Sequence, residues 1–574
     1  MPGRAQTRVT GSPHCLGKNA AVTDLAGGAG NRSSGGFVLL ILASAQFLMA
    51  LDSSVMNVSI ATVAKDLGTT VTGIQVAITL YTLVMAAFMI TGGKIGQIFG
   101  RKRTFMIGCV VYGCGSAMTA LSPTLPFLLV GWSILEGLGA ALILPAVVAL
   151  VATNFGPAER PRAYGLVMSA AAIAVAAGPL IGGLFTTYAS WRWVFAGEVL
   201  LVLVIVAMSR RMVDSPPEPG TKLDPIGTVL SALGLGMVVF GIVRAGTWGF
   251  VQPKPDAPQW LGASPVIWLI LGGAVVITLF VLWENRRLEK GRGVLIDPHM
   301  LQVRGLQAGL ISFFFQYLLQ AGLFFVIPLF LSVALGLSAV ATGVRLLPLS
   351  LTILAAAAGV PRLFPNASPR RVVRIGFGLL AAGTMILVAA LDAGAGPEVV
   401  TWPLLLAGFG VGSLASQLGS VTVSSLPTSK SGEVGGIQNT VMYLGASVGT
   451  ALSGTILIAV LTTTFLGNVA SDPAVPQEMS AQAQVQLSAG IPFVSDADLN
   501  ATLQKAGVPP DTAQAIAADN ASARLNGLRA ALSVLALLAL LALAATRRLP
   551  TKQPGADEVQ SDPPEDEEVS PAAT

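Results

Sequence analysis

The stretch that decides the fold is residues 72–103, which read TGIQVAITLYTLVMAAFMITGGKIGQIFGRKR. Residues 72–95 are almost entirely apolar, and a helix that crosses a bilayer needs about 20 such residues. Residues 96–103 add two glycines, which suit a tight turn, and a basic run that anchors a loop at the cytoplasmic surface. The stretch therefore predicts a membrane-spanning helix that ends on the cytoplasmic side.

The composition of the whole chain agrees with a membrane protein. Its 574 residues have a mean hydropathy of +0.72, and only 11% of them are charged. A soluble domain has about 25% charged residues. The formal net charge of +5 does not indicate a nucleic-acid partner, because the basic residues gather in short connections between apolar runs.

About fourteen apolar runs are long enough to span a bilayer. They centre on residues 37–60, 72–95, 104–122, 125–151, 163–187, 193–213, 225–246, 264–283, 305–334, 339–361, 371–391, 401–425, 434–464 and 525–546. Basic residues cluster in every second connection, and the positive-inside rule assigns those connections and both termini to the cytoplasm. We therefore expect an all-α, multi-pass protein of the bacterial cytoplasmic membrane.

Three segments lie outside these spans. Residues 1–36 are expected to form a cytoplasmic segment, and residues 547–574 a disordered acidic cytoplasmic tail. Residues 465–524 are expected to form a long, polar outer loop that is partly helical over 511–523.

The turn after the second span resembles the cytoplasmic signature of the major facilitator superfamily. The residues that match it are Gly93, Gly100, Arg101, Lys102 and Arg103. Gln97 and Ile98 occupy the positions where that signature has aspartate and arginine. A basic, glycine-rich loop is a weak signal alone, and its position after the second span makes it specific.

Two further stretches resemble the fourteen-helix branch of drug:proton antiporters within that superfamily. The fifth span carries the antiporter signature, with Gly178, Pro179, Gly182 and Gly183, followed by SWRWVF at 190–195, and the first span carries LDSSVMNV at 51–58. The small residues of the fifth span also suit simple helix packing, which is compatible with that signature. The resemblance implies two six-helix bundles, over 37–213 and 305–546, with two inserted helices over 225–283.

The fourth span departs from the pattern of this branch. Ser133 stands where the branch has an arginine that is implicated in proton coupling, and Glu136 stands where it has glutamine. The fourth span therefore lacks the arginine at position 133 and has a carboxylate three residues later, at Glu136.

Asp52 in the first span and Glu136 in the fourth are the leading functional residues. An ionisable group near the bilayer centre costs about 3 kcal/mol or more unless it faces a cavity or a partner. The resemblance implies that both spans line a central cavity, where poorly hydrated carboxylates suit proton loading and release near neutral pH. The structural alternative for Asp52 is a cap or a helix–helix hydrogen bond with Ser53, Ser54 or Asn57. For Glu136 it is a salt bridge with an arginine such as Arg345 that only pins the two halves together.

Three other charged residues lie nearer to span ends. Glu198 is expected at the outer interface, and Glu433 at the cytoplasmic surface. Arg345, early in the tenth span, either gates the outer side or extends to the membrane interface.

The substrate is expected to contact polar and aromatic stripes, spaced three or four residues apart on one helix face. They comprise Phe313, Gln316, Tyr317 and Gln320 in the ninth span and Ser413 and Gln417 in the twelfth. A lipid-facing aromatic stretch is the alternative for the ninth span.

The sequence contains no Walker signature, no catalytic constellation and no Cys/His spacing of a metal site. We expect neither enzyme activity, metal nor cofactor, and a proton gradient as the energy source. The leading prediction is multidrug efflux: a monomer in membrane lipid exchanges protons for lipophilic, including cationic, small molecules and so confers antibiotic resistance. The alternatives are a dedicated exporter of one endogenous lipid, siderophore or secondary metabolite, and a non-transporting scaffold of an envelope complex.

Overall fold

The computed structural model describes residues 27–155, 160–212, 214, 223–254, 257–364, 366–392, 394–423, 425–426, 431–487, 491 and 493–551. These residues form helices, and the one pairing of extended backbone among them is an isolated bridge between Trp260 and Ala263. The predictions for residues 1–26 and for nearly all of the tail 547–574 fall outside the described residues.

The first part of the chain, which we call the N-terminal half, is a series of long helices. It comprises α1 (Gly27–Asp66), α2 (Val71–Phe99), α3 (Arg101–Ala120), α4 (Leu125–Leu128), α5 (Gly137–Asn154), α6 (Arg160–Tyr188) and α7 (Arg192–Ser209). Between α4 and α5 the backbone is π-helical over η1 (Leu129–Glu136). Such segments are rare inside long helices and frequently mark functional sites.

The rest of the chain begins with a hairpin of α8 (Pro225–Trp248) and α9 (Pro265–Glu289), followed by the short helix η2 (Pro298–Gln302). The C-terminal half comprises α10 (Arg304–Leu329), η3 (Phe330–Ala334), α11 (Ala339–Leu363), α12 (Pro369–Ala390), η4 (Pro397–Val400), α13 (Thr401–Val423), α14 (Ser431–Ser471), α15 (Gln477–Gln486), α16 (Asp496–Lys505), α17 (Pro510–Ala545) and η6 (Thr546–Arg548).

Within the described residues, 12 helical stretches are long and apolar enough to cross a membrane. Two of the fourteen predicted spans are not among them. One is α3, which begins with three basic residues, and the other is α6, whose apolar part Ile173–Tyr188 is shorter. The prediction of an all-helical membrane protein is confirmed, whereas the count of fourteen spans stays a prediction.

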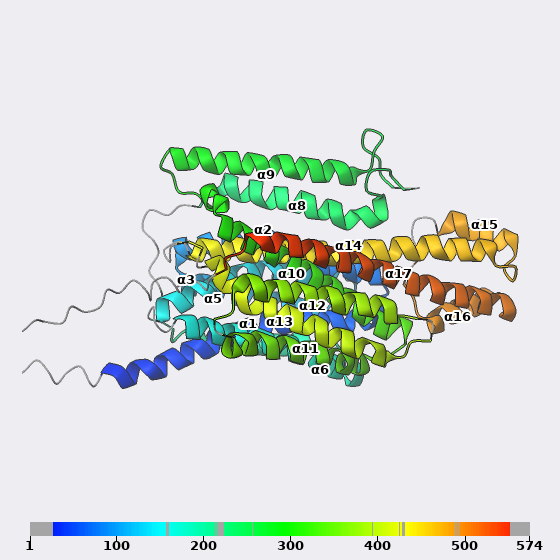
Figure 1. The fold of residues 1–574 in the computed structure, drawn as a ribbon, viewed down its shortest axis with the longest axis horizontal. Helices are drawn as coiled ribbons and strands as arrows, with labels where there is room; N and C mark the ends of the chain where they lie inside the picture. Colours follow the sequence, from blue (N-terminus) through cyan, green and yellow to red (C-terminus); the bar gives the residue numbers. More distant parts are fainter. Residues whose placement is uncertain are drawn as a thin grey trace, which may run out of the picture.

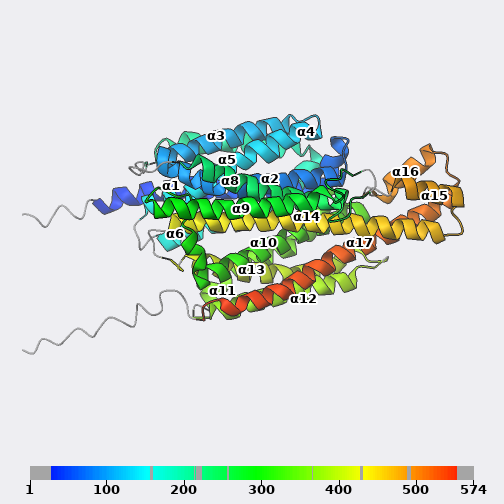
Figure 2. The same cartoon turned by 90° about the horizontal axis from the view of Figure 1, so that it is seen from above.

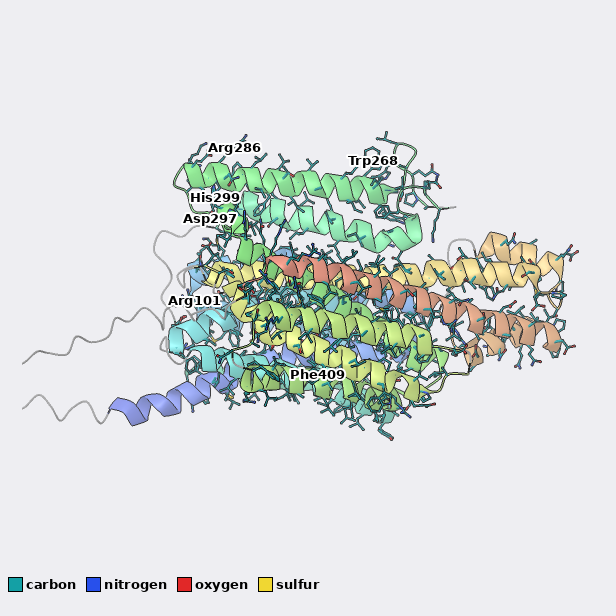
Figure 3. The ribbon with its side chains drawn as sticks, in the orientation of Figure 1. Arg101, Trp268, Arg286, Asp297, His299 and Phe409 are labelled. Atoms are coloured by element: carbon teal, nitrogen blue, oxygen red, sulfur yellow. The ribbon has the colours of Figure 1, made fainter. Side chains whose placement is uncertain are left out.

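The long helices lie side by side in one bundle (Figure 1). One end of this bundle, which we call the basic end, carries basic residues. Arg101, Arg286 and His299 lie at this basic end, whereas Trp268 lies at the opposite end of α9 (Figure 3). α1 begins and α17 ends at the basic end as well (Figure 2).

The two halves meet along two seams, one between α6 and α11 and the other between α2 and α14. At the first seam, a Cβ atom on Gly343 would lie only 2.1 Å from the carbonyl oxygen of Pro179, so the two backbones touch. At the second seam, Nε2 of Gln75 donates hydrogen bonds to the carbonyl oxygens of Thr450 (3.0 Å) and Ala451 (3.3 Å). Both contacts lie away from the basic end.

The α8–α9 hairpin lies along one side of the bundle (Figures 1 and 2). α8 packs on α2 and α14 and so covers the second seam, whereas α9 packs mainly on α8. Apolar side chains of α9, such as Leu271 and Val275, are exposed to the surroundings of the chain, as in a helix that faces lipid. Near the basic end, Asp224 accepts a hydrogen bond from Nε1 of Trp283 (2.8 Å) and pairs with Arg287 (3.2 Å).

Segment 465–524 is more helical than the sequence predicts. α14 continues to Ser471 and α17 begins at Pro510, so both extend beyond the bundle and carry α15 and α16 between them (Figures 1 and 2). Arg524 fixes this extension: its guanidinium donates to the carbonyl oxygen of Val494 (2.6 Å) and to Oδ1 of Asp496 (2.5 Å). The segment is rich in Ala and Gln, which are good helix formers, so the helices continue where the apolar pattern ends.

Candidate functional site

Asp52 is fully buried in the middle of α1, where its neighbours come from other helices. Nε1 of Trp132, in η1, donates a hydrogen bond to Oδ1 of Asp52 at 2.8 Å. The Trp132 ring stacks on the Tyr81 ring with 4.9 Å between the ring centroids. Nδ2 of Asn57 donates a hydrogen bond to the carbonyl oxygen of Ser53 (2.7 Å). The alternative in which Asn57 binds the Asp52 side chain is therefore not what the structure has. Asp52 is therefore bound across helices.

Glu136 is also fully buried, at the last residue of η1. Its Oε1 accepts a hydrogen bond from Oγ1 of Thr119 in α3 at 3.0 Å. The alternative of a salt bridge to Arg345 is not what the structure has, since Arg345 lies half-buried in α11 and none of the ion pairs among the described residues joins it to Glu136. A neutral donor occupies one oxygen of this carboxylate.

Glu198 of α7 joins the same site, so its expected position at the outer interface is wrong. The side chain is 2% exposed, and its Oε2 accepts a hydrogen bond from Oγ of Ser116 in α3 at 3.1 Å. Glu198 lies seven residues along α7, which is about 10 Å of helix. The distance of Glu198 from the start of its span can be read from the sequence. Its proximity to Asp52 and Glu136 cannot.

Asp52, Glu136 and Glu198 form one cluster, in which a carboxylate oxygen of each lies within 4.8 Å of the others. Each residue also has one oxygen without a hydrogen-bond partner among the described residues. Three carboxylates at this spacing are a donor set that suits a hard cation as well as protons. The neutral donors Trp132, Thr119 and Ser116 already occupy one oxygen of each.

The predicted stripe in the ninth span lies on α10 and is largely buried. Phe313 and Gln316 are 4% and 2% exposed, and Oε1 of Gln316 has no hydrogen-bond partner among the described residues. Tyr317 contacts the Phe313 ring, with 6.5 Å between centroids, and Gln320 is half-buried. Tyr443 of α14 is half-buried and packs against the same hydrophobic core as Phe313.

The second predicted stripe, on α13, is buried but is partly used within its own helix. Ser413 donates to the carbonyl oxygen of Phe409 at 2.7 Å, and Gln417 lies 3.5 Å from Oγ of Ser416. Phe409 itself is 44% exposed and borders an open apolar hollow on the surface together with Thr352. The Ser413 hydroxyl has thus used its one donor within the helix, and its oxygen can still accept a hydrogen bond.

The basic run after α2 binds the ends of neighbouring helices. Gly100 has a φ of 95°, a backbone conformation that favours glycine at this turn. Nζ of Lys102 donates to the carbonyl oxygens of Arg210 (2.9 Å) and Met212 (2.6 Å) beyond α7. The Lys102 backbone N–H donates a hydrogen bond to Oδ1 of Asp214 at 3.1 Å. Asp214 thus places a carboxylate beside this loop, whose own signature position has Gln97 instead of aspartate.

The same loop touches α5 through Arg101. Its guanidinium donates to the carbonyl oxygen of Ala149 (3.3 Å) and to Oγ1 of Thr153 (3.2 Å). Gly93 is half-buried, and Arg103 is exposed. The loop thus ties α2 and α3 to α5 and α7 at the basic end.

The glycines of the predicted antiporter signature lie at close helix contacts in α6. A Cβ atom on Gly178 would lie 2.3 Å from Oγ of Ser54, and one on Gly183 would lie 2.6 Å from the carbonyl oxygen of Ala339. Gly182 packs on Val55, also in α1. The signature therefore holds α6 against α1 on one side and against α11 on the other.

Comparison with known proteins agrees with this architecture. Residues 42–450 match the Major Facilitator Superfamily. The chain is 30% identical to the puromycin resistance protein pur8 of Streptomyces alboniger, over 76% of this chain and 84% of that protein. It is 28% identical to the multidrug efflux pump LfrA of Mycolicibacterium smegmatis, over 73% of this chain and 80% of that protein.

Solved structures show the same fold at low sequence identity. A bacterial homologue of the human lysosomal transporter Spinster, in an inward-facing conformation, matches with a TM-score of 0.57 and 14% identity, over 90% of this chain and 98% of that one. The human organic anion transporter MFSD10 matches with a TM-score of 0.52 and 13% identity, over 90% and 99%. Since the family match covers most of the sequence and the fold agrees with it, this chain belongs to the Major Facilitator Superfamily, a family of transporters rather than enzymes.

Proposed function

We propose that the chain is a proton-coupled antiporter that exports lipophilic small molecules, cations among them, across the bacterial cytoplasmic membrane. The observation that carries the proposal is the burial of Asp52 and Glu136 in one cluster within a transporter fold. Buried charges are retained in membrane helices chiefly where they serve transport. The resistance and efflux proteins among the relatives support the direction of transport.

The exchange follows from competition for the carboxylates. A carboxylate that has released its proton to the cytoplasm attracts a cationic substrate, and protonation from the outer side removes that attraction. The proton and the substrate thus stabilise different states of the same site, which is what couples their movements. Phe313, Gln316, Tyr317 and Gln320 would contact the apolar part of the substrate, with Ser413 and Gln417 nearby.

The proposed topology has fourteen spans, with two six-helix bundles and α8–α9 inserted between them. α3 and α6 are included because each packs along its length on neighbours that can span: α3 on α5 and α7, and α6 on α1 and α11. In a topology with an even number of spans both termini lie on one side, and the basic residues at one end of the bundle support the cytoplasm as that side. One chain contains the whole site, so a monomer surrounded by lipid suffices.

The first test is proton flux in everted membrane vesicles, with a panel of lipophilic cations and neutral compounds. We expect substrate-induced proton release from the vesicles with wild type and near-background release with Asp52→Asn and Glu136→Gln. The matched control is Glu284→Gln, which neutralises a buried carboxylate of α9 outside the cluster and keeps an oxygen to accept the Leu295 N–H (2.8 Å). Proton release that survives both cluster variants would remove these residues from the coupling path.

A second candidate is a dedicated exporter of one secondary metabolite. It is favoured by two relatives, a probable actinorhodin transporter of Streptomyces coelicolor and a tetracenomycin C resistance and export protein of Streptomyces glaucescens, each 28% identical over 73% of this chain. The same panel separates the candidates, since a multidrug exporter responds to several unrelated compounds and a dedicated one to a single scaffold.

A further inference from the structure

Glu198 brings a third carboxylate into a site for which two would suffice. Asp52 comes from α1, Glu136 from η1 and Glu198 from α7, and α3 supplies hydroxyl donors to the last two. All three side chains are at most 2% exposed, and one oxygen of each lies within 4.8 Å of the others. The cluster therefore lies inside the N-terminal half, away from water.

No positive charge balances the cluster within the described residues. None of their ion pairs includes Asp52, Glu136 or Glu198, and the hydrogen bonds to these carboxylates come from neutral indole and hydroxyl groups. Three negative charges at this separation in a poorly hydrated site repel one another strongly, so the three groups cannot all be ionised together. Where no cation is bound, protons must therefore occupy part of the site.

The unpartnered atoms indicate how many protons the site holds. Oδ2 of Asp52, Oε2 of Glu136 and Oε1 of Glu198 have no donor among the described residues. Tyr81, a residue only 1% exposed, stacks on the Trp132 ring that binds Asp52, and its hydroxyl has no hydrogen-bond partner in the same part of the chain. Two protons together with this hydroxyl would provide three donors for the three free oxygens and leave one negative charge.

The other titratable groups around the cluster are tyrosines. They are Tyr81 on α2, Tyr112 on α3 and Tyr443 on α14. A tyrosine stays neutral near pH 7, so these groups donate hydrogen bonds and do not neutralise a carboxylate. The proton count of the site therefore depends on the three carboxyl groups.

We propose that Glu198 is a third proton-binding residue of the transport site, and that Asp52, Glu136 and Glu198 share two protons when no substrate is bound. The proposal rests on the proposed antiport function for its physiological role. Sharing protons within the cluster needs no acceptor outside it, and in the transport cycle protons leave the cluster to the cytoplasm and are replaced from the outer side. Glu198→Gln keeps an oxygen that accepts the Ser116 hydroxyl and removes only the proton site.

The test is infrared spectroscopy of the full chain in lipid nanodiscs, which records the carbonyl stretch of protonated carboxylic acids between acidic and alkaline pH. The triple variant Asp52→Asn, Glu136→Gln, Glu198→Gln is the blank, and Glu284→Gln is the control for a buried carboxylate elsewhere. We expect Glu198→Gln to reduce the cluster signal near neutral pH to about half, because two carboxylates retain one shared proton. An unchanged signal would mean that Glu198 is only an ionised acceptor and would overturn the proposal.

A second variant keeps the test decisive if Glu198→Gln does not fold. In Asp52→Asn, Glu136→Gln, the protonated-acid signal that remains above the blank near neutral pH must come from Glu198, and its absence at that pH would also reject the proposal. Proton flux in vesicles is measured in parallel. A wild type that shows the infrared signal but no substrate-induced flux would contradict the antiport function and leave the proton-binding assignment standing.

Discussion

At the scale of single residues, Trp132 joins the carboxylate cluster to the packing of α2. Its indole N–H binds Asp52 at 2.8 Å, while its ring stacks on Tyr81 with an interplanar angle of 3°. A phenylalanine would keep the stack and lose the hydrogen bond. The two contacts can therefore be separated by one substitution.

We expect Trp132→Phe to shift the pH profile of efflux and to destabilise the protein by about 1–3 kcal/mol, because a buried carboxylate oxygen loses its donor. The measurement is efflux of a fluorescent cation as a function of pH, with a thermal melt of the purified chain. Trp193→Phe, at a tryptophan that is 62% exposed, is the matched control. An identical pH profile for the two variants would show that the indole N–H has no part in coupling.

The sequence identifies Asp52 and Glu136 because a charge inside an apolar run is conspicuous. It does not identify Trp132 or Tyr81, since aromatic residues are common in such runs and their roles depend on neighbours from other helices. The role of Glu198 escapes the sequence for a related reason: it stands near the start of its span, and only the packing of α7 on α3 brings it to the cluster.

At the scale of helices, the α6–α11 seam depends on backbone contact between the halves. A Cβ atom on Gly343 would lie 2.1 Å from the carbonyl oxygen of Pro179, so any larger residue separates the two helices. Gly359 lies in the same helix α11, and a Cβ atom added there would have nothing within 4 Å. The pair offers one substitution at a contact and one away from it.

We expect Gly343→Ala to destabilise the folded chain by about 1–3 kcal/mol through overpacking and to reduce efflux. Gly359→Ala should leave both nearly unchanged. The measurements are chemical unfolding of purified protein and efflux in cells at matched expression. Equal behaviour of the two variants would contradict a seam held by backbone contact.

The extension beyond the bundle makes its own prediction through Arg524, which is 2% exposed. Arg524→Ala removes hydrogen bonds to Val494 and Asp496, which we expect to destabilise the extension by about 2 kcal/mol. Limited proteolysis from the outer side should then cut residues 472–510 faster than in wild type. Lys505→Ala, at an exposed position, is the control, and equal cleavage rates would show that Arg524 does not fix the extension.

The helical extension also shows where reading a sequence by hydropathy fails. The apolar pattern ends near residue 464, and from there the sequence predicts a loop, although α14 continues to Ser471. Hydropathy reports contact with lipid, whereas helix formation depends on backbone propensity and packing. Inside a bilayer a helix is also apolar, so hydropathy locates it. Outside the bilayer a helix can be polar, and hydropathy does not.

At the scale of the whole molecule, the fourteen-span topology requires α3 and α6 to cross the bilayer. We expect single cysteines at Leu121, after α3, and at Tyr188, after α6, to react with a membrane-impermeant thiol reagent from the outer side of intact cells. Both positions are 77% exposed. A cysteine at Arg103 should react only after permeabilisation, and labelling of Leu121→Cys and Arg103→Cys from the same side would reject the fourteen-span topology.

The order of the helices could be predicted from the sequence because each span needs a long apolar run and because basic residues mark one side. α3 meets this criterion poorly, because it begins with three basic residues and also carries Ser116 and Thr119, which face the buried carboxylates. The side of the bundle on which α8 and α9 lie could not be predicted, since an apolar helix packs equally well against any lipid-facing surface.

The position of that hairpin makes the periphery of the transporter asymmetric. α8 lies across the contact between α2 and α14, whereas no inserted helix among the described residues covers the contact between α6 and α11. A lipophilic compound that diffuses within the bilayer therefore meets two different barriers: a covering pair of helices on one flank, and directly opposed glycine-rich backbones on the other. Sideways entry from the lipid would have to displace the hairpin as well as part α2 from α14 on the first flank, and only to part α6 from α11 on the second.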